Sequence, residues 1–474
     1  MPASENRPFC ACSTPGGVSG IAVIRMSGKG SFEVAGKVFR ILRAAGDVKD
    51  ISSMEGYTAA LARAFDPETG NNVDDCVITV FRAPHSYTGD DMVEISCHGG
   101  VAVKQELIRI LTENGARAAL PGEFTKTAFL NGKLDLTEAE AVMNVIASDS
   151  ERALRASNIQ LGGALKRELK EAEDKLYEAL SKIEMMVEFP EHDDTPENTR
   201  EVLDIITKVR ETFISLRDSY KKGKVLSERM KVALCGLPNS GKSSLLNSLT
   251  GYDRAIVTEV AGTTRDTLEV EVNVNGIPVT LIDTAGIRET DDRIEAMGVE
   301  RAREASFESD LVLYLAAPDM PSDEMTGQIR DLIAGGVDKG SMAVVFSKSD
   351  LGTNSSSEKI RSECRAMGIE SFISVSSVDR IYLEELKNFI TDRYENLGGI
   401  SSSETILINK RHALLIEESV GYLDMGIDAI ENDMGLDAAS SVLRLALDKT
   451  GEITGKSVSS ELVDNIFSRF CIGK

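Results

Sequence analysis

The sequence predicts a multidomain protein of the α/β plus α class: an α+β N-terminal domain, a helical domain, and an α/β domain inserted into the helical one. Three observations support this prediction. The chain has 474 residues, which is more than one hydrophobic core usually serves. The region 229–396 alternates strand-like and helix-like patterns and begins with a glycine-rich motif. Helical periodicity ends before this region and resumes after it, as an insertion requires.

Composition narrows the class of protein. Hydrophobic residues make up 42% of the chain, enough for several packed cores, while the net charge of -23 argues against a broad basic surface for nucleic acid. The seven cysteines are scattered without metal-ligand spacing, so we expect reduced thiols, no disulfide and no zinc. Neither a signal-peptide core nor an apolar run of membrane-spanning length is found, so we expect a cytoplasmic protein without a membrane segment.

The N-terminal domain is expected to comprise residues 1–133. Runs with strand character alternate there with turn signals, and one run has the helical period. The expected strands are 21–26, 57–65, 73–81 and 92–97, and the expected helix is 101–114.

The helical domain is expected in two parts, 134–228 and 397–474. The first part has the helical period without a proline over 135–189 and resumes as an antiparallel return over 197–222. The second part is helical by period over 408–470. Neither part has the length of a typical bundle by itself, but chain order alone does not establish that the two pack together.

Near the start of the inserted domain, 229–396, the motif Gly236-Leu237-Pro238-Asn239-Ser240-Gly241-Lys242-Ser243 follows the short apolar run Val232-Ala233-Leu234. A strand followed by G-x-x-x-x-G-K-[ST] is the pattern of a nucleotide-binding loop. Its glycines let the backbone curl around a β-phosphate, Lys242 reaches the β and γ oxygens, and Ser243 offers a hydroxyl to Mg²⁺.

Two further elements follow the loop. Asp283-Thr284-Ala285-Gly286 comes after a strand, where the carboxylate can hold Mg²⁺ through water and the glycine amide can approach the γ-phosphate. Gly262-Thr263-Thr264-Arg265-Asp266 offers Thr264 as a second hydroxyl for Mg²⁺. Between them, Asn275-Gly276 predicts a β-hairpin. The three spaced elements together specify a GTPase of the switch type.

A fourth element, Ser347-Lys348-Ser349-Asp350, follows the strand-like run 343–346, where such enzymes read the base. Asp350 can accept from the N1–H and the 2-amino group of guanine, and adenine offers no matching donors. Ile287 occupies the position where many GTPases have a glutamine that orients water, so another residue must do this. No arginine finger can be assigned, and a monovalent cation could supply the positive charge that the transition state needs.

Further motifs extend the pattern. Ala255-Ile256-Val257-Thr258 lies within the inserted domain, and three lie outside it: Pro121-Gly122-Glu123-Phe124-Thr125, the run from Ala128 to Leu136, and the terminal Phe470-Cys471-Ile472-Gly473-Lys474. With these, the chain resembles the MnmE (TrmE) family of tRNA uridine-modifying GTPases over essentially its full length. The resemblance implies an α+β N-terminal domain that binds folate and dimerises, a helical domain, and an inserted Ras-like P-loop G domain activated by potassium-dependent dimerisation. It also implies a homodimer that joins the FAD-dependent partner MnmG (GidA) in a heterotetramer. That complex would act on tRNA, installing an aminomethyl-type group at carbon 5 of the wobble uridine with 5-formyl- or methylene-tetrahydrofolate as the one-carbon source.

The resemblance also implies roles for individual residues. Folate would contact Arg25, Glu94, Lys133 and Lys474. Potassium would be held by Asn239, Thr258, Val260 and Thr263, and magnesium by Ser243 and Thr264. Glu295 would orient the attacking water, and Cys471 is the candidate for a direct role in the modification chemistry. The expected GTP contacts are Asn239, Ser240, Gly241, Lys242, Ser243, Ser244, Thr258, Thr263, Thr264, Asp283, Thr284, Ala285, Gly286, Ser347, Lys348, Asp350, Ser376 and Ser377.

The chain departs from the family pattern at three places in the inserted domain. Ser347 stands where the family has an asparagine that contacts guanine and braces the phosphate loop, Ser376-Ser377 replaces a Ser-Ala clamp, and the following Asp379 to Tyr382 lacks the usual glycines. In the N-terminal domain, Lys126 and Thr127 stand where one or two arginines are common. Two other hypotheses stay open: a non-enzymatic regulatory GTPase that signals assembly or docks on ribosomes, and a protein that uses ATP. The N-terminal domain and the terminal Cys-Ile-Gly-Lys favour the enzyme, because a pure switch needs neither.

Overall fold

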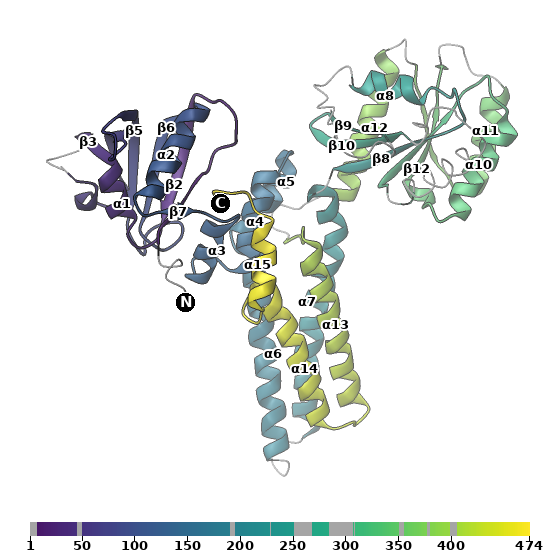
Figure 1. Ribbon diagram of the computed structural model, residues 1–474. Coiled ribbons are helices and arrows are strands. Elements are labelled where there is room, and N and C mark those ends of the chain that lie inside the picture. Colours follow the sequence, from purple (N-terminus) through teal and green to yellow (C-terminus); the bar gives the residue numbers. More distant parts are fainter. Residues whose placement is uncertain are drawn as a thin grey trace. The chain divides into compact units, whose positions relative to one another are not determined.

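The computed structural model describes residues 7–44, 50–189, 195–227, 229–250, 268–283, 307, 309–349, 355–376, 380–398 and 405–474 (Figure 1). The chain divides into two compact units. The first unit comprises Met1–Met143, Gln160–Phe213 and Leu415–Lys474, and the second comprises Asn144–Ile159 and Ile214–Leu414. In the part of the chain that the structure describes, no helix combines the length and apolar character needed to cross a membrane.

The first unit begins with a seven-stranded sheet of order β3-β4-β5-β6-β2-β1-β7. Its strands are β1 (Phe9–Cys12), β2 (Ile21–Ser27), β3 (Phe39–Ala44), β4 (Thr58–Phe65), β5 (Asn72–Phe81), β6 (Met92–His98) and β7 (Arg117–Ala118). The helices α1 (Ser31–Val38) and α2 (Val101–Glu113) pack on one face, and a 3₁₀ turn, η1, spans Ile51–Ser53. Alternate residues Ala60, Ala62 and Ala64 of β4 are buried there, as the period of two requires. The four expected strands and the expected helix are confirmed.

The helices of the first unit are α3 (Glu123–Leu130), the start of α4 (Leu136–Ala147), α6 (Ala164–Glu188), most of α7 (Pro196–Ser227), most of α13 (Lys410–Glu431), α14 (Leu436–Thr454) and α15 (Ser460–Ser468). The helical run expected from 135 is interrupted, because Gly163 has a φ of 74°, a left-handed conformation that ends a helix. Ion pairs join the first helical segment to the second: Glu184 of α6 pairs with Arg444 of α14, and Arg210 of α7 pairs with Asp424 of α13. The two helical segments therefore pack together, as Figure 1 shows for α6, α7, α13 and α14.

The second unit contains a six-stranded sheet of order β13-β12-β11-β8-β10-β9. Its strands are β8 (Met230–Cys235), β9 (Leu268–Val274), β10 (Ile277–Asp283), β11 (Leu311–Ala316), β12 (Met342–Phe346) and β13 (Ser371–Ser374), all parallel except β9. Its helices are α5 (Glu151–Leu161, up to Ile159), α8 (Lys242–Thr250), α10 (Ser322–Ala334), α11 (Ser355–Met367) and α12 (Arg380–Gly398), with a 3₁₀ turn, η2, at Lys339–Ser341. The predicted hairpin is confirmed: Asn275 (φ 52°) and Gly276 (φ 85°) join β9 to β10.

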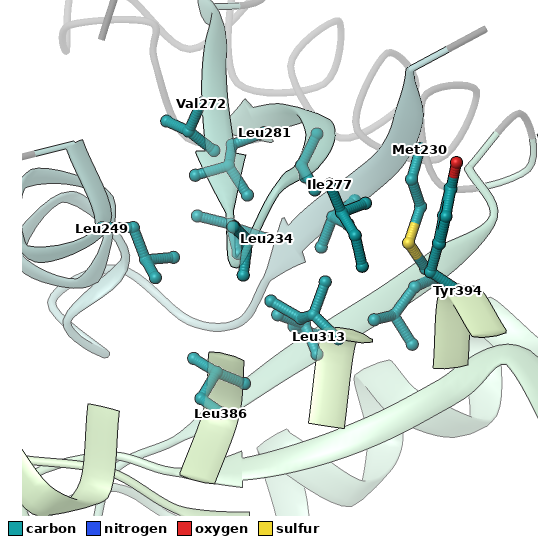
Figure 2. Close-up of a cluster of buried hydrophobic side chains, with 14 of the residues drawn as sticks. Met230, Leu234, Leu249, Val272, Ile277, Leu281, Leu313, Leu386 and Tyr394 are labelled. Carbon is teal, nitrogen blue, oxygen red and sulfur yellow. The ribbon is translucent and has the colours of Figure 1, made fainter. Parts of the chain in front are cut away.

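The core beneath this sheet is apolar throughout. Figure 2 shows Leu234 of β8, Leu281 of β10 and Leu313 of β11 in one buried cluster with Leu386 and Tyr394 of α12. Strands buried on both faces carry continuous hydrophobic runs, which is why β10 and β11 are buried at every position. In this sheet β8 lies between β10 and β11, so the strand order reverses at its carboxyl end. That is the point where open α/β sheets bind ligands.

Candidate functional site

The phosphate loop leaves β8 at this reversal point. Gly236 has a φ of 138°, and a Cβ on it would lie 2.6 Å from the carbonyl oxygen of Leu315, so only glycine fits. Lys242 is buried, and its Nζ donates to the carbonyl oxygens of Gly236 (2.7 Å) and Leu237 (2.8 Å). Burial lowers the pKa of Lys242, and the nearby carboxylate of Asp283 opposes that shift. A cation therefore lies inside the loop with an acid facing it.

The hydroxyls of the loop differ in exposure. Ser240 is buried, whereas Ser243 and Ser244 are exposed in the first turn of α8. The N–H groups of a helix's first turn have no intrahelical partners, so they can bind an anion such as a phosphate. Asn239 is exposed in the loop with a φ of 64°. The predicted phosphate and cation ligands that the structure describes thus meet at one end of one helix.

The base-reading motif is tied to this loop. The Ser347 hydroxyl donates to the carbonyl oxygen of Ser240 at 2.7 Å, and both residues are buried. Lys348 has a φ of 55° and its Nζ donates to Asp319 at 2.8 Å, which holds the pKa of that carboxyl below its usual value. Ser376 is buried one residue beyond Val375, whose carbonyl accepts from the Ser349 amide at 3.1 Å. The serine at 347 therefore braces the phosphate loop, as the family's asparagine was expected to do.

Other predicted residues lie outside the described residues. These are Thr258, Val260, Thr263 and Thr264, then Thr284, Ala285, Gly286 and Glu295, and finally Asp350 and Ser377. Their roles stay predictions.

A second cluster of predicted residues lies on the N-terminal sheet. Arg25 and Glu94 face each other across β2 and β6, and Nε (2.9 Å) and Nη2 (2.6 Å) of Arg25 both donate to Glu94 Oε1. The Arg25 guanidinium also lies 5.3 Å from the ring centre of Tyr87 and 5.6 Å from that of Phe124. Such a cation held between two rings and a carboxylate is fixed in orientation before any ligand arrives.

The C-terminal tail and Lys133 lie close to this cluster. The Lys474 carbonyl oxygen accepts from the Phe124 amide (3.2 Å), and the Cys471 carbonyl accepts from the Gly122 amide (3.4 Å). The Cys471 side chain is exposed. Lys133 donates to the carbonyl oxygen of Pro84 at 3.0 Å, on the loop that carries Tyr87. The structure thus brings Arg25 and Glu94 into direct contact and sets Lys133 and Lys474 against the segments that flank them.

Sequence reasoning missed three residues here. Tyr87 and Phe124 flank the arginine, and burial raises the pKa of the Tyr87 phenol, whose oxygen lies 2.9 Å from that of Thr125. Ser13 donates to the Gly473 carbonyl at 2.9 Å and anchors the tail. Phe124 belongs to the motif Pro121–Thr125, but the motif by itself indicated no role for it. Nothing in the sequence near Ser13 indicates its contact with Gly473.

These features define a P-loop nucleotide-binding protein: the reversed strand order, the glycine loop with its buried lysine, and the base motif braced by Ser347.

The family model "MnmE helical domain" matches residues 136–471, and "GTP-binding protein TrmE N-terminus" matches residues 8–133. The protein "tRNA modification GTPase MnmE" of Acetivibrio thermocellus is 38% identical over 98% of this chain and 99% of its own. That of Lactobacillus acidophilus is 38% identical over 99% of both chains. The chain belongs to the MnmE family of tRNA modification GTPases.

Proposed function

We propose that this protein hydrolyses GTP and couples the hydrolysis to a folate-dependent modification of tRNA. In this proposal a cytoplasmic homodimer and an FAD-dependent partner of the MnmG (GidA) type form a heterotetramer that adds an aminomethyl-type group to carbon 5 of the wobble uridine. Its domains are 1–133, 134–228, 229–396 and 397–474. The observation that carries the proposal is the C-terminal tail bonded beside Arg25 in a chain that also has a nucleotide loop. A regulatory switch without chemistry has no need of that arrangement.

On the nucleotide side, Lys242 would contact the β- and γ-phosphates and the amides at the start of α8 would bind their oxygens. Ser243 and Thr264 would hold Mg²⁺, with Asp283 behind them. The exposed hydroxyl of Ser243 follows directly after Lys242, the lysine that interacts with the buried Asp283, and a hydroxyl and a carboxylate fit a hard cation. The metal would neutralise charge on the phosphates. Potassium would bind at Asn239, Thr258, Val260 and Thr263, and would supply the charge that an arginine finger gives elsewhere. Glu295 would orient the attacking water, and Asp350 would select guanine.

On the folate side, the donor set fits a flat, polar ring. The Glu94 carboxylate can accept from the ring N–H and amino groups of a pterin, while the Arg25 guanidinium stays paired to it. The rings of Tyr87 and Phe124 offer apolar faces. Lys133 and Lys474 would meet the negatively charged end of the cofactor, and the exposed thiol of Cys471 lies on the same tail. The bound folate would supply the one-carbon unit.

The cofactor test is calorimetry with 5-formyl-tetrahydrofolate. We expect binding by the wild type and loss of most of the heat in Arg25→Ala. Arg63→Ala is a matched control, because the Arg63 guanidinium also donates two hydrogen bonds to a carboxylate, that of Asp75, elsewhere on the same sheet (2.6 and 2.9 Å). If the wild type gave no binding heat, or if both variants lost the same amount of heat, the proposal that this site binds folate would be wrong.

The functional test is mass spectrometry of the wobble uridine in tRNA from a deletion strain. The proposal expects unmodified uridine that returns with the wild-type gene and not with an Arg25→Ala gene. A full complement of modification in the deletion strain would favour the regulatory switch instead.

A further inference from the structure

A groove runs along the open edge of the sheet in the second unit. The edge strand is β13, with α11 on one side and α12 on the other. The groove has a volume of about 550 Å³ and its walls include Arg361, Phe372, Ser374, Glu385, Asn388 and Asp392. It is an open depression of the surface and not an enclosed cavity. Because β12 and β11 separate β13 from β8, this groove is distinct from the phosphate loop.

The edge strand turns polar backbone groups into the groove. The amide of Val375 donates to the Phe346 carbonyl at 2.8 Å, so this residue faces β12. In a parallel ladder alternate residues face opposite sides of the strand. Phe372 and Ser374 therefore direct their N–H and C=O groups away from β12, toward the groove.

The α11 wall is basic. The Arg361 guanidinium lies 5.2 Å from the ring centre of Phe346 and 5.3 Å from that of Phe372, and Arg365 lies 5.5 Å from the Phe372 ring. Cation–π contacts of this kind fix a guanidinium without using its N–H groups in a salt bridge. Among the residues that the structure describes, no carboxylate forms an ion pair with Arg361 or Arg365, although the whole chain carries a net charge of -23.

The α12 wall is acidic. Glu385, Asn388 and Asp392 are exposed at positions i, i+3 and i+7, so they share one face of the helix. Phe389 beside them is half-buried and packs against the core, giving an apolar floor. The groove is thus bipolar, with donors for an anion on α11 and acceptors for N–H groups on α12.

We propose that this groove binds one nucleotide unit of a single-stranded RNA. The phosphate lies toward Arg361 and Arg365, the N–H edge of the base lies toward Glu385 and Asp392, and Phe389 supports the ring. Arginine is well suited to phosphate oxygens, and aspartate and glutamate accept from the amino groups of bases. An extended peptide could use the backbone of β13, but it would not need acids opposite two arginines that form no ion pair with the described carboxylates. The RNA would be tRNA, a step that rests on the proposed function.

The test uses the full-length protein saturated with GDP and Mg²⁺, so that the phosphate loop is filled. The probe is a single-stranded RNA decamer of mixed sequence that carries 5-iodouridine. We expect crosslinks in peptides from α12 or β13, and affinity roughly ten-fold lower in Arg361→Gln, since one phosphate contact is lost. The slope of log affinity against log salt should fall by about 0.7 for that contact.

Lys359→Gln is the matched control, because it removes one charge from the same helix and Lys359 is paired with Asp323 (2.7 Å). It should bind the decamer like the wild type, and both variants should hydrolyse GTP normally. Three results would each overturn the proposal. The first is equal binding of the decamer by Arg361→Gln and the wild type, and the second is crosslinks confined to other elements. The third is binding of free mononucleotides without binding of the decamer. A failed wobble-uridine assay with groove crosslinks retained would refute the proposed function alone.

Discussion

Replacement of Ser347 by alanine tests the brace between the base motif and the phosphate loop. Ser347→Ala removes the hydroxyl that donates to Ser240 at 2.7 Å and leaves that carbonyl oxygen without this donor in a buried site. An unsatisfied buried acceptor costs about 1–3 kcal/mol, and the lower end applies if water reaches it. Because the loop must hold its shape to bind phosphate, we expect GDP affinity to fall by about five-fold, the equivalent of about 1 kcal/mol.

The assay is titration with a fluorescent GDP. Ser347→Thr keeps the hydroxyl and should bind like the wild type. Ser349→Ala is the control, since the buried Ser349 hydroxyl has no hydrogen-bond partner in the described part of the chain. If Ser347→Ala stayed within two-fold of the wild type, or if Ser349→Ala lost as much affinity, the bracing role would be wrong.

A second prediction concerns Ser347, which stands where the family has an asparagine, and the effect of this difference on guanine binding. The Ser347 hydroxyl has one hydrogen, and the loop takes it, so it has none to donate to guanine. Ser347→Asn has two N–H donors and should tighten GDP binding, while ADP should stay weaker than GDP in both proteins, since the proposal assigns guanine selection to Asp350. Unchanged GDP binding in Ser347→Asn, or ADP binding equal to GDP in the wild type, would contradict this.

Three further predictions concern catalysis and the tail. GTP hydrolysis should be faster in potassium than in sodium, because Asn239 lies exposed in the loop where a cation could replace an arginine finger, and equal turnover would count against this. Glu295→Ala should lower kcat and leave GTP affinity intact, since water orientation acts in the transition state; weakened binding with normal kcat would mean a structural role. Gly473→Ala should detach the tail, because its Cβ would lie 2.5 Å from the carbonyl oxygen of Cys12 at a φ of 93°, and folate heat should fall while GTP hydrolysis persists. Unchanged folate binding in that variant would separate the tail from the cofactor site.

Features that depend on a few neighbouring residues, such as turns and loops, could be predicted from the sequence. The Asn275-Gly276 turn formed because both residues accept the positive φ of a two-residue hairpin, and the phosphate loop formed because glycine alone fits beside Leu315. The resemblance named Arg25 and Glu94 separately, and the register of β2 and β6 explains why they meet.

Contacts between distant residues could not be predicted in this way. Ser13 and Gly473 are 460 positions apart, and no periodicity links them. The packing partners of Ala156 could not be predicted either. This residue lies in a run of helical period, yet it packs in the core with Met230 and Tyr394. A helical pattern states which face is apolar and leaves open which partner covers that face.

The phosphate loop and the base motif, which are the two parts of the nucleotide site, each contain a residue with a strained backbone. Asn239 in the phosphate loop and Lys348 in the base motif both have a positive φ, and for lysine this conformation costs about 1–2 kcal/mol. The structure offsets that cost with contacts on either side of Lys348: its own bond to Asp319, the Ser347 amide to Ala316 (3.0 Å) and the Ser349 amide to Val375 (3.1 Å). Because Ser347 also reaches the phosphate loop, the backbone that leads to residue 350 and the loop that holds phosphate share one network. A change that relaxes Lys348 should therefore affect base selection before it affects phosphate binding, since the Ser347 hydroxyl is the link between that network and the loop that the described residues show.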